Sequence, residues 1–302
     1  MTNKFLIADN VDVAYIGSNF SVRRICLSLE EGKRCVIYGR EGCGKTLILR
    51  TLAGLEDCTC GKILFGNKDL KDIDVKDREI GFTFDFSSLD SKKSVRDILE
   101  FPMLLRNFDD EIIERCLKQT ADIFSLAINA KVADLSEFEK VKLLLARLFS
   151  IERRLYIIDD VWKDLPFEER KEIVDLIDGV ARGKSVVIAT QDIETARRLC
   201  ESSICVASNG GCIRYDTFDE MKTRPKNLES AILSGYSIYM DVLGKNEHGY
   251  FANIEGQTAF VEKPLNDIYV GKKVCFAVED GICVKSFYYD KDCERIISLQ
   301  NK

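Results

Sequence analysis

The sequence of 302 residues is long enough for one large domain, or for a large domain and a small one, and its 46% hydrophobic content can supply ordinary cores. A net charge of −6 argues against a domain that binds a nucleic-acid backbone through its overall charge, so we expect no nucleic-acid partner. No basic start leads into an apolar segment, and no apolar run approaches the length of a membrane span. We therefore expect a cytoplasmic protein whose twelve cysteines are reduced thiols.

Short alternating runs near the start of the chain predict strands at 4–8, 11–15 and 20–22. An aromatic ring in this leading segment, that of Tyr15, can stack on an adenine ring. An aromatic residue in a strand is more often part of the core, so both roles stay open for Tyr15.

A glycine-rich stretch then fits the phosphate-binding pattern G-x-x-x-x-G-K-[ST], with a β-prone run at 33–38 before it and a helix-prone run at 47–55 after it. Backbone N–H groups of such a loop can converge on a phosphate, and the following helix adds its positive N-terminal end. Lys45 would reach the β- and γ-phosphates of ATP, and Thr46 would ligate Mg²⁺. An ordinary strand-to-helix turn needs no Lys-Thr after its last glycine. The predicted nucleotide-binding residues of the loop are Gly39, Arg40, Glu41, Gly42, Cys43, Gly44, Lys45 and Thr46.

The middle of the chain changes its pattern twice. After predicted strands at 61–66 and 80–84, residues 91–148 have charged, helical periodicity, which predicts a helical insert. An apolar run from Arg154 then ends in Asp159 and Asp160, as a strand does when it delivers a carboxylate that holds Mg²⁺ through water. A plain capping aspartate is the alternative.

The remaining sequence predicts an α/β fold that is followed by a β-rich segment. A helix at 167–179, a strand at 185–191, a helix at 193–200 and a hairpin at 204–215 predict a largely parallel sheet around the phosphate-binding loop. Beyond residue 235 the pattern is β-rich, which predicts a small all-β domain at 236–302.

Residues 1–234 resemble the nucleotide-binding subunit of ABC transporters, and the motifs occur in the order of that family. Tyr15 matches its adenine-stacking aromatic, the loop from Gly39 to Thr46 its Walker A motif, and Asp159 its Walker B acid. The pairing of Leu135-Ser136 with 145–147 matches the frame of its signature helix. The resemblance implies a P-loop NTPase core with an antiparallel β subdomain and a helical insert. Arg224-Pro225 and the β-rich end are similar to importer ATPases that carry an OB-like TOBE domain and serve sugars, polyamines, ferric ions or oxyanions.

The chain departs from the family pattern where turnover depends on it. The family has Gln, Glu, Asp and His where this chain has Asp85, Asp160, Pro166 and Gln191. The resemblance makes Asp160, Gln191 and Asp85 the catalytic positions, and it places Asp85 with Thr46 and Asp159 around Mg²⁺. Asp160 lacks one methylene of the usual general base, and Gln191 can donate a hydrogen bond but cannot carry a positive charge.

The signature segment differs as well. The family sequence LSGGQ lets backbone amides approach the γ-phosphate held by the opposite subunit, and this chain has in its place Leu135, Ser136, Glu137, Phe138 and Glu139. Glu137 and Glu139 either repel that phosphate or turn to solvent, and the sequence leaves both alternatives open.

The resemblance therefore implies an ATPase subunit that couples binding and hydrolysis of ATP, with Mg²⁺, to movement of transmembrane permease subunits, in import and with reduced hydrolysis. It would lie on the inner face of the cell membrane and pair with a second ABC ATPase subunit, identical or different. The alternative is a catalytically degenerate regulatory or structural partner with little turnover. Soluble ABC proteins that act on ribosomes or DNA usually carry two ATPase domains or a long coiled coil, and this chain has neither pattern.

Overall fold

The structure, a computed structural model, describes residues 4–14, 17, 20–208, 210–223 and 230, and six strands between 238 and 301. The chain forms two compact units, Met1–Arg214 and Tyr215–Lys302. Tyr15, Asn209, Arg224-Pro225 and the predicted domain boundary near 235 lie outside the described residues. The division at 1–234 and 236–302 therefore stays a prediction.

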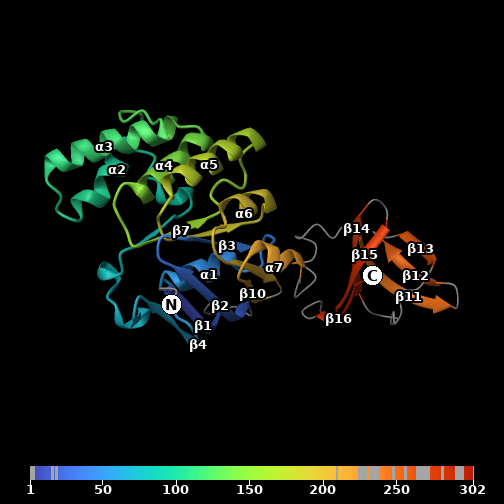
Figure 1. Cartoon of the computed structure of the whole chain (residues 1–302). Helices are drawn as coiled ribbons and strands as arrows, with labels where there is room; N and C mark the ends of the chain where they lie inside the picture. Colours follow the sequence, from blue (N-terminus) through green and yellow to red (C-terminus); the bar gives the residue numbers. More distant parts are fainter. Residues whose placement is uncertain are drawn as a thin grey trace. The chain divides into compact units, whose positions relative to one another are not determined.

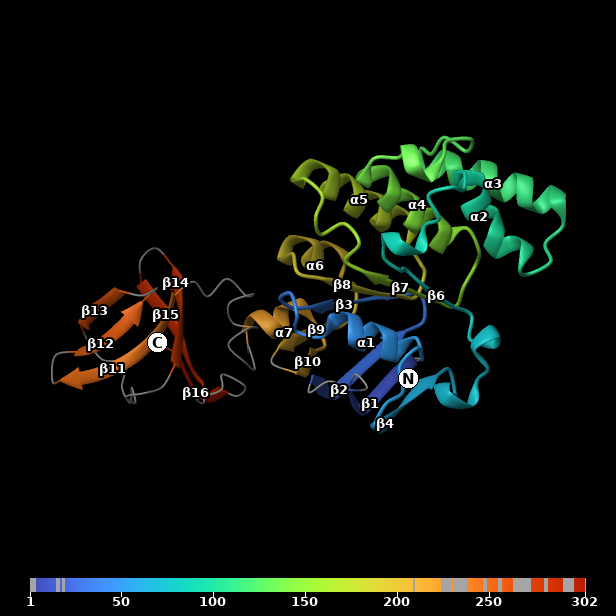
Figure 2. The ribbon, with the colours of Figure 1, turned by 180° about the vertical axis from the view of Figure 1, so that it is seen from behind.

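The first unit is built on one continuous mixed sheet of ten strands (Figures 1 and 2). Its strand order is β5-β4-β1-β2-β10-β9-β3-β8-β7-β6. The strands are β1 Lys4–Ala14, β2 Ser21–Glu30, β3 Arg34–Tyr38, β4 Cys60–Phe65, β5 Lys68–Asp69, β6 Ile80–Phe82, β7 Leu155–Asp159, β8 Val186–Thr190, β9 Ile204–Ser208 and β10 Gly211–Tyr215.

The sheet is mixed rather than largely parallel. Strands β6, β7, β8, β3 and β9 run parallel, whereas β1 pairs antiparallel with both β2 and β4, and β4 pairs antiparallel with β5. Short connections allow only antiparallel neighbours, which accounts for the pairs β1–β2 and β4–β5. The runs at 4–8 and 11–15 were predicted as separate strands, but their described residues, up to Ala14, form the single strand β1. An irregularity between Ala8 and Val11 takes up the break in alternation.

The central strands are apolar because helices cover them. Every residue of β3 and β8 is buried, as parallel strands with two covered faces require. Helix α1, Lys45–Leu52, contacts β7 and β8, and helix α6, Ile193–Leu199, contacts β3 and β8. The two helices lie on opposite sides of these strands in both ribbon views (Figures 1 and 2).

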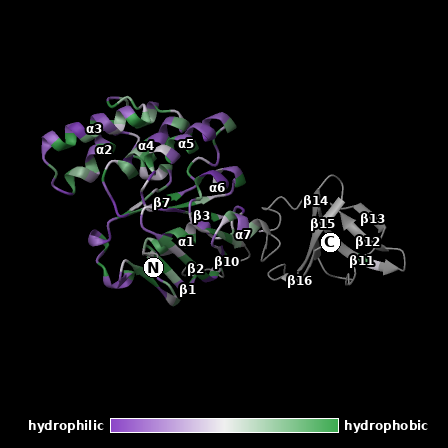
Figure 3. Cartoon of the chain, in the orientation of Figure 1, coloured by the Kyte–Doolittle hydropathy of each residue, from purple (hydrophilic) through white to green (hydrophobic). Residues whose placement is uncertain are grey.

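The predicted helical run at 91–148 contains three helices that pack on one another: α2 Val95–Leu104, α3 Asp110–Phe124 and α4 Glu137–Phe149. Helix α5, Phe167–Val180, packs against α4. Figure 3 shows hydrophilic residues along the outer turns of α3 and α5 and hydrophobic residues on the strands beneath. In the part of the chain that the structure describes, no helix has the length and apolarity that crossing a membrane requires.

The second unit holds helix α7, Phe218–Thr223, and a six-stranded antiparallel sheet in the order β13-β12-β11-β14-β15-β16. The β-rich pattern is confirmed at the level of strands, and the likeness to a TOBE domain stays a prediction. The strands are β11 Ile238–Asn246, β12 Gly249–Ile254, β13 Gln257–Glu262, β14 Lys273–Glu279, β15 Ile282–Tyr289 and β16 Ile296–Asn301.

Candidate nucleotide-binding site

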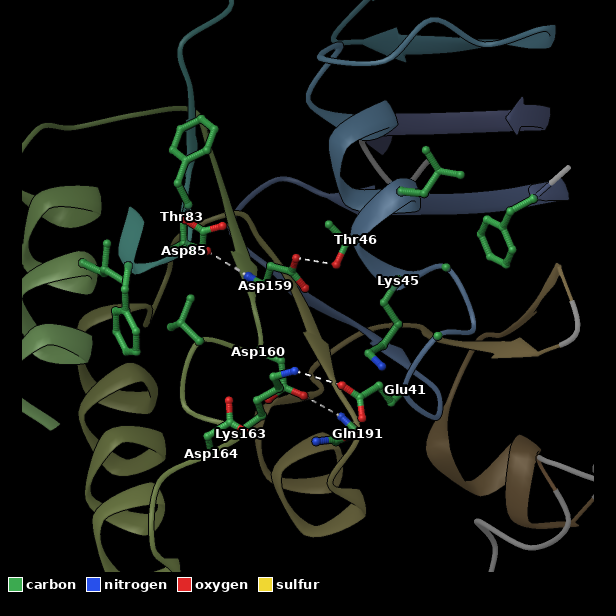
Figure 4. A pocket seen from close by; sticks show the side chains of 18 residues that line it. Glu41, Lys45, Thr46, Thr83, Asp85, Asp159, Asp160, Lys163, Asp164 and Gln191 are labelled. Atoms are coloured by element: carbon green, nitrogen blue, oxygen red, sulfur yellow. Dashed lines mark hydrogen bonds and ion pairs between the residues drawn. The ribbon is translucent and has the colours of Figure 1, made fainter. Parts of the chain in front are cut away.

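A cavity of about 740 Å³ lies at the carboxyl ends of β3, β7 and β8. Ligands of open α/β sheets bind at this edge, where loops leave the strands. Figure 4 shows its polar side chains turned toward one another from four segments of the chain. Those labelled there are Glu41, Lys45, Thr46, Thr83, Asp85, Asp159, Asp160, Lys163, Asp164 and Gln191.

The phosphate-binding loop connects β3 to α1 and is shaped by two glycines with positive φ, Gly42 at 75° and Gly44 at 102°. A side chain on Gly44 would collide with that of Val22, so glycine is required there for space as well as for φ. The ammonium of Lys45 donates to the carbonyl oxygens of Gly39, at 2.8 Å, and Arg40, at 2.9 Å. No side chain caps the start of α1. The first N–H groups of α1 therefore face the cavity edge without a side-chain acceptor.

The proposed metal ligands already lie together. The hydroxyl of Thr46 donates to Asp159 Oδ2 at 2.7 Å, and the backbone N–H of Asp159 donates to Thr83 Oγ1 at 2.9 Å. Burial raises the pKa of Asp159, and the hydrogen bond from Thr46 acts in the opposite direction. A hydroxyl and a carboxylate are hard oxygen ligands of the kind that Mg²⁺ takes beside nucleotide phosphates. The residues present therefore fit Mg²⁺.

Asp160 is more confined than Asp159. Its backbone is in the left-handed region at φ 25°, its exposed fraction is 7%, and its Oδ2 accepts from the backbone N–H of Gln191 at 3.0 Å. Burial raises the pKa of Asp160 to about 6, against the opposing effect of that hydrogen bond. The two predicted catalytic residues are thus joined by a hydrogen bond from the main chain of Gln191 to the Asp160 side chain. This bond holds the Asp160 carboxylate toward the end of β8.

The raised pKa of Asp160 predicts a pH-dependent stability. A carboxyl group with a folded-state pKa above its unfolded value of 3.8 stabilises the folded protein below that value, and this contribution is lost as the pH rises through about 6. Asp160→Asn removes the ionisation and keeps an acceptor for Gln191. We expect the free energy of unfolding of the variant, relative to the parent, to rise by about 1 to 2 kcal/mol between pH 5 and pH 8 in urea titrations without nucleotide or metal. A pH-independent difference would show that Asp160 is ionised throughout this range.

Asp85 lines the cavity from the segment after β6, as predicted, but its Oδ1 is engaged locally. It accepts from the backbone N–H of Ser87 at 2.9 Å, so that Asp85 caps the short 3₁₀ turn Phe86–Ser88. It also accepts from the Ser87 hydroxyl. These bonds occupy Oδ1 and leave Oδ2 of Asp85 for a ligand. Its catalytic and metal roles stay predictions.

The signature segment lies apart from this cavity, at the start of α4, and Leu135 to Glu139 are not among the residues described as lining the cavity. Glu139 Oε2 accepts from both the N–H and the hydroxyl of Ser136, each at 2.9 Å, and the Ser136 hydroxyl accepts in turn from the Glu139 N–H. These hydrogen bonds lower the pKa of Glu139. Glu139 thus closes a capping box on its own helix, and both alternatives for its charge stay predictions.

Phe138 also has a local contact, because the ammonium of Lys142 lies 4.6 Å from the centroid of its ring. The segment that replaces LSGGQ is thus used to begin a helix.

Several cavity residues were not predicted from the sequence. Phe20, Thr83, Phe84 and Phe86 line it from segments read only as strands or their ends, while Lys163 and Asp164 come from the loop after β7. The position of Lys163 four residues after Asp159 is a signal that could have found it, because loops that leave the carboxyl ends of parallel strands converge on one edge.

Comparison with known proteins agrees with this geometry. Residues 22–163, which include the phosphate-binding loop and both strand-end aspartates, match the family model described as ABC transporter. Over this stretch the chain is similar to the ATP-binding domain of ABC transporters. The chain is 27% identical over 246 residues to the multiple sugar-binding transport ATP-binding protein MsmK of Streptococcus mutans, covering 76% of this chain and 65% of that protein.

Two further relatives are named as import proteins. The trehalose import ATP-binding protein SugC of Mycobacterium tuberculosis is 26% identical over 74% of this chain and 58% of its own length. The sulfate/thiosulfate import ATP-binding protein CysA of Bordetella bronchiseptica is 29% identical over 54% of this chain and 49% of its own length. The chain thus spans between about half and two thirds of the length of these curated relatives.

Solved structures show the same fold. The structure of cbiO1 from Clostridium perfringens, described as part of the ABC transporter complex cbiONQ, matches with a TM-score of 0.63 at 20% identity over 74% of this chain and 96% of that chain. A dimeric ATP-binding cassette bound to ADP and Pi matches with a TM-score of 0.62 at 22% identity over 70% of this chain and 98% of that chain. These likenesses show an ABC-type P-loop NTPase fold.

Proposed function

We propose that this chain binds ATP with Mg²⁺ and serves as the ATP-binding subunit of an ABC importer, with reduced hydrolysis. The observation that carries the proposal is the cluster in which Lys45 crosses the phosphate-binding loop while Thr46 and Asp159 share a 2.7 Å hydrogen bond. Lys45 would hold the β- and γ-phosphates, and Thr46, Asp159 and Asp85 would hold Mg²⁺. The ion would neutralise phosphate charge, and Tyr15 or Phe20 would offer a ring face to the adenine.

The proposed partners are a second ABC ATPase subunit, identical or different, and transmembrane permease subunits, which would keep the chain at the inner face of the cell membrane. Support comes from the names of the relatives, which are transport or import ATP-binding proteins for sugars, trehalose or sulfate and thiosulfate. We propose that the second unit is a TOBE-like domain on the strength of its six antiparallel strands.

Reduced hydrolysis is supported by three features of the described residues. Asp160 is short, buried and bonded to the main chain of Gln191, so its carboxylate is held back from the cavity centre. Gln191 cannot act as a charged group. The segment that replaces LSGGQ uses Glu139 as a cap and presents Glu137 in the first turn of α4. The same features favour, as the second candidate, a regulatory partner that binds ATP and barely turns over.

The binding half of the proposal is tested by calorimetric titration of ATP with Mg²⁺ and with EDTA. Among the described residues, five carboxylates and two ammonium groups line the cavity, so we expect ATP to bind roughly tenfold more weakly without the metal. In Asp159→Asn the two conditions should give nearly the same affinity, whereas Asp122→Asn, an exposed position on α3, should behave like the parent. Absence of ATP binding under both conditions would contradict the proposal.

A further inference from the structure

An ion pair joins the two loops that border the candidate site. Lys163 Nζ lies 3.0 Å from Glu41 Oε1, so that the loop after β7 is tied to the phosphate-binding loop. Figure 4 shows this contact beside Asp160 and Gln191, with Lys45 nearby. Both partners line the cavity, and neither belongs to the metal pair of Thr46 and Asp159.

The backbone of Lys163 is fixed by its neighbours. Its N–H donates to the carbonyl oxygen of Asp160 at 3.1 Å, and the N–H of Leu165 donates to that of Trp162, also at 3.1 Å. Trp162 is fully buried and Leu165 is 6% exposed, which anchors this turn in the core. The Lys163 side chain, 41% exposed, therefore reaches the cavity from a rigid base and can exchange one partner for another.

Both groups of the pair are charged at neutral pH. The hydrogen bond from Lys163 lowers the pKa of Glu41, and that same bond raises the pKa of Lys163. The charge of Lys163 also lowers the pKa of Asp159 and of Asp160, although burial has the larger and opposite effect on each. The ammonium is thus within electrostatic range of the carboxylates at the metal end of the cavity, where the terminal phosphate of a nucleotide would lie.

Glu41 stands at an adverse position for a phosphate ligand. It belongs to the loop whose backbone N–H groups would surround the phosphates, and its carboxylate has the same sign of charge as they do. Without Lys163, this carboxylate would repel a nucleotide. When the ion pair is formed, the ammonium of Lys163 is occupied by Glu41.

We infer that Lys163 is a second phosphate-binding lysine, and that Glu41 holds its ammonium until the terminal phosphate of ATP replaces the Glu41 carboxylate. The inference rests on the proposed binding of ATP in this cavity. It adds a competition between the Glu41 carboxylate and the terminal phosphate for the ammonium of Lys163. ATP, which carries a terminal phosphate at the metal end, displaces Glu41, whereas ADP leaves the ion pair in place. Lys163 therefore favours ATP over ADP, and Glu41 reduces the size of that preference.

The test must separate contact with phosphate from simple neutralisation of Glu41, since Lys163→Met alone would also expose an unpaired carboxylate. Calorimetric titrations with a non-hydrolysable ATP analogue and with ADP, both with Mg²⁺, compare the parent with Glu41→Gln, Lys163→Met and the double variant. Glu41→Gln should tighten binding of the ATP analogue severalfold, because its competitor is gone. In the Glu41→Gln background, Lys163→Met should weaken the ATP analogue roughly tenfold and ADP less than about twofold.

A matched control is the pair of Lys184 and Glu152, which has the same 3.0 Å distance but lies outside this cavity, so Lys184→Met should change neither affinity. If Lys163→Met has no effect once Glu41 is Gln, Lys163 only neutralises Glu41 and the inference is overturned. Equal weakening of the ATP analogue and ADP overturns it as well. Failure of the parent to bind either nucleotide would instead refute the proposed function itself.

Discussion

Lys45→Ala is expected to weaken ATP binding by roughly a hundredfold or more, because the ammonium would make charge-assisted hydrogen bonds to two phosphates and each would contribute about 1.5 to 3 kcal/mol. In the structure this ammonium lies on the carbonyl oxygens of Gly39 and Arg40, on the loop itself. It is therefore already placed where phosphates would enter and needs only to change acceptors. Calorimetric titration with ATP and Mg²⁺ measures the loss.

The fold should survive this substitution, because one of the two carbonyl bonds is at an exposed site and the other is only partly buried, so that water can take the place of the ammonium. Circular dichroism and the urea midpoint of Lys45→Ala should match those of the parent. Lys71→Ala, at a side chain that is 75% exposed, is the control for removing a lysine and should bind ATP normally. Equal affinity of Lys45→Ala and the parent would refute the assignment of the phosphate-binding loop.

The central strands and the phosphate-binding loop could be predicted from the sequence because their causes are local. Strand β3 is confirmed at the run predicted before the loop, and α1 begins at Lys45, directly after the last glycine. Four consecutive apolar residues followed by glycines that need positive φ leave few alternatives to a buried strand and a tight turn. The meeting of Thr46 with Asp159 was predictable for a related reason, because parallel strands deliver their carboxyl ends to one edge.

The remaining features of the site depend on distant segments. No local pattern brings Glu41 to Lys163, which is contributed by a different loop, or makes the main chain of Gln191 the partner of Asp160. The burial that raises the pKa of Asp160 likewise follows from packing around β7 and β8. Glu139 is different, since Ser136 and Glu139 have the spacing of a capping box. This signal is local, although the predicted alternatives concerned only the charges of Glu137 and Glu139.

Restoring two side chains is expected to raise hydrolysis at this subunit's own site by on the order of a hundredfold, because a misplacement near 1 Å of a reacting group can cost that much in rate. Asp160→Glu lengthens the carboxylate arm by roughly 1.5 Å, one C–C bond, and frees it from the Gln191 N–H that now holds it at 3.0 Å. Gln191→His adds a side chain that can carry a proton beside the terminal phosphate. The double variant combines both changes, and ATP turnover of the assembled complex is the measurement.

A second repair, at the signature segment, should act on the other site of a two-subunit assembly. Glu137→Gly and Phe138→Gly let the backbone approach a phosphate, and Glu139→Gln retains the capping bonds to Ser136, because glutamine serves at this position of a capping box. The two glycines cost about 1 kcal/mol each in helix propensity, so stability is measured in parallel. In a heterodimer, substituting the partner's own phosphate-binding lysine would inactivate the site formed by the partner's phosphate-binding loop and this chain's signature segment.

The two repairs are therefore expected to have different effects when the partner's phosphate-binding lysine is substituted. With the partner's lysine removed, the gain from Asp160→Glu with Gln191→His should persist, and the gain from the signature repair should vanish. In the proposed dimer, each composite site would join one subunit's phosphate-binding loop to the other's signature. Parent turnover is expected to be slow, because Asp160 lies back against the main chain and Glu137 and Glu139 place two carboxylates in the first turn of α4. If the parent complex hydrolyses ATP at the rate of an ordinary importer and neither repair alters it, the confinement of Asp160 is compensated elsewhere and the chain works as a full motor.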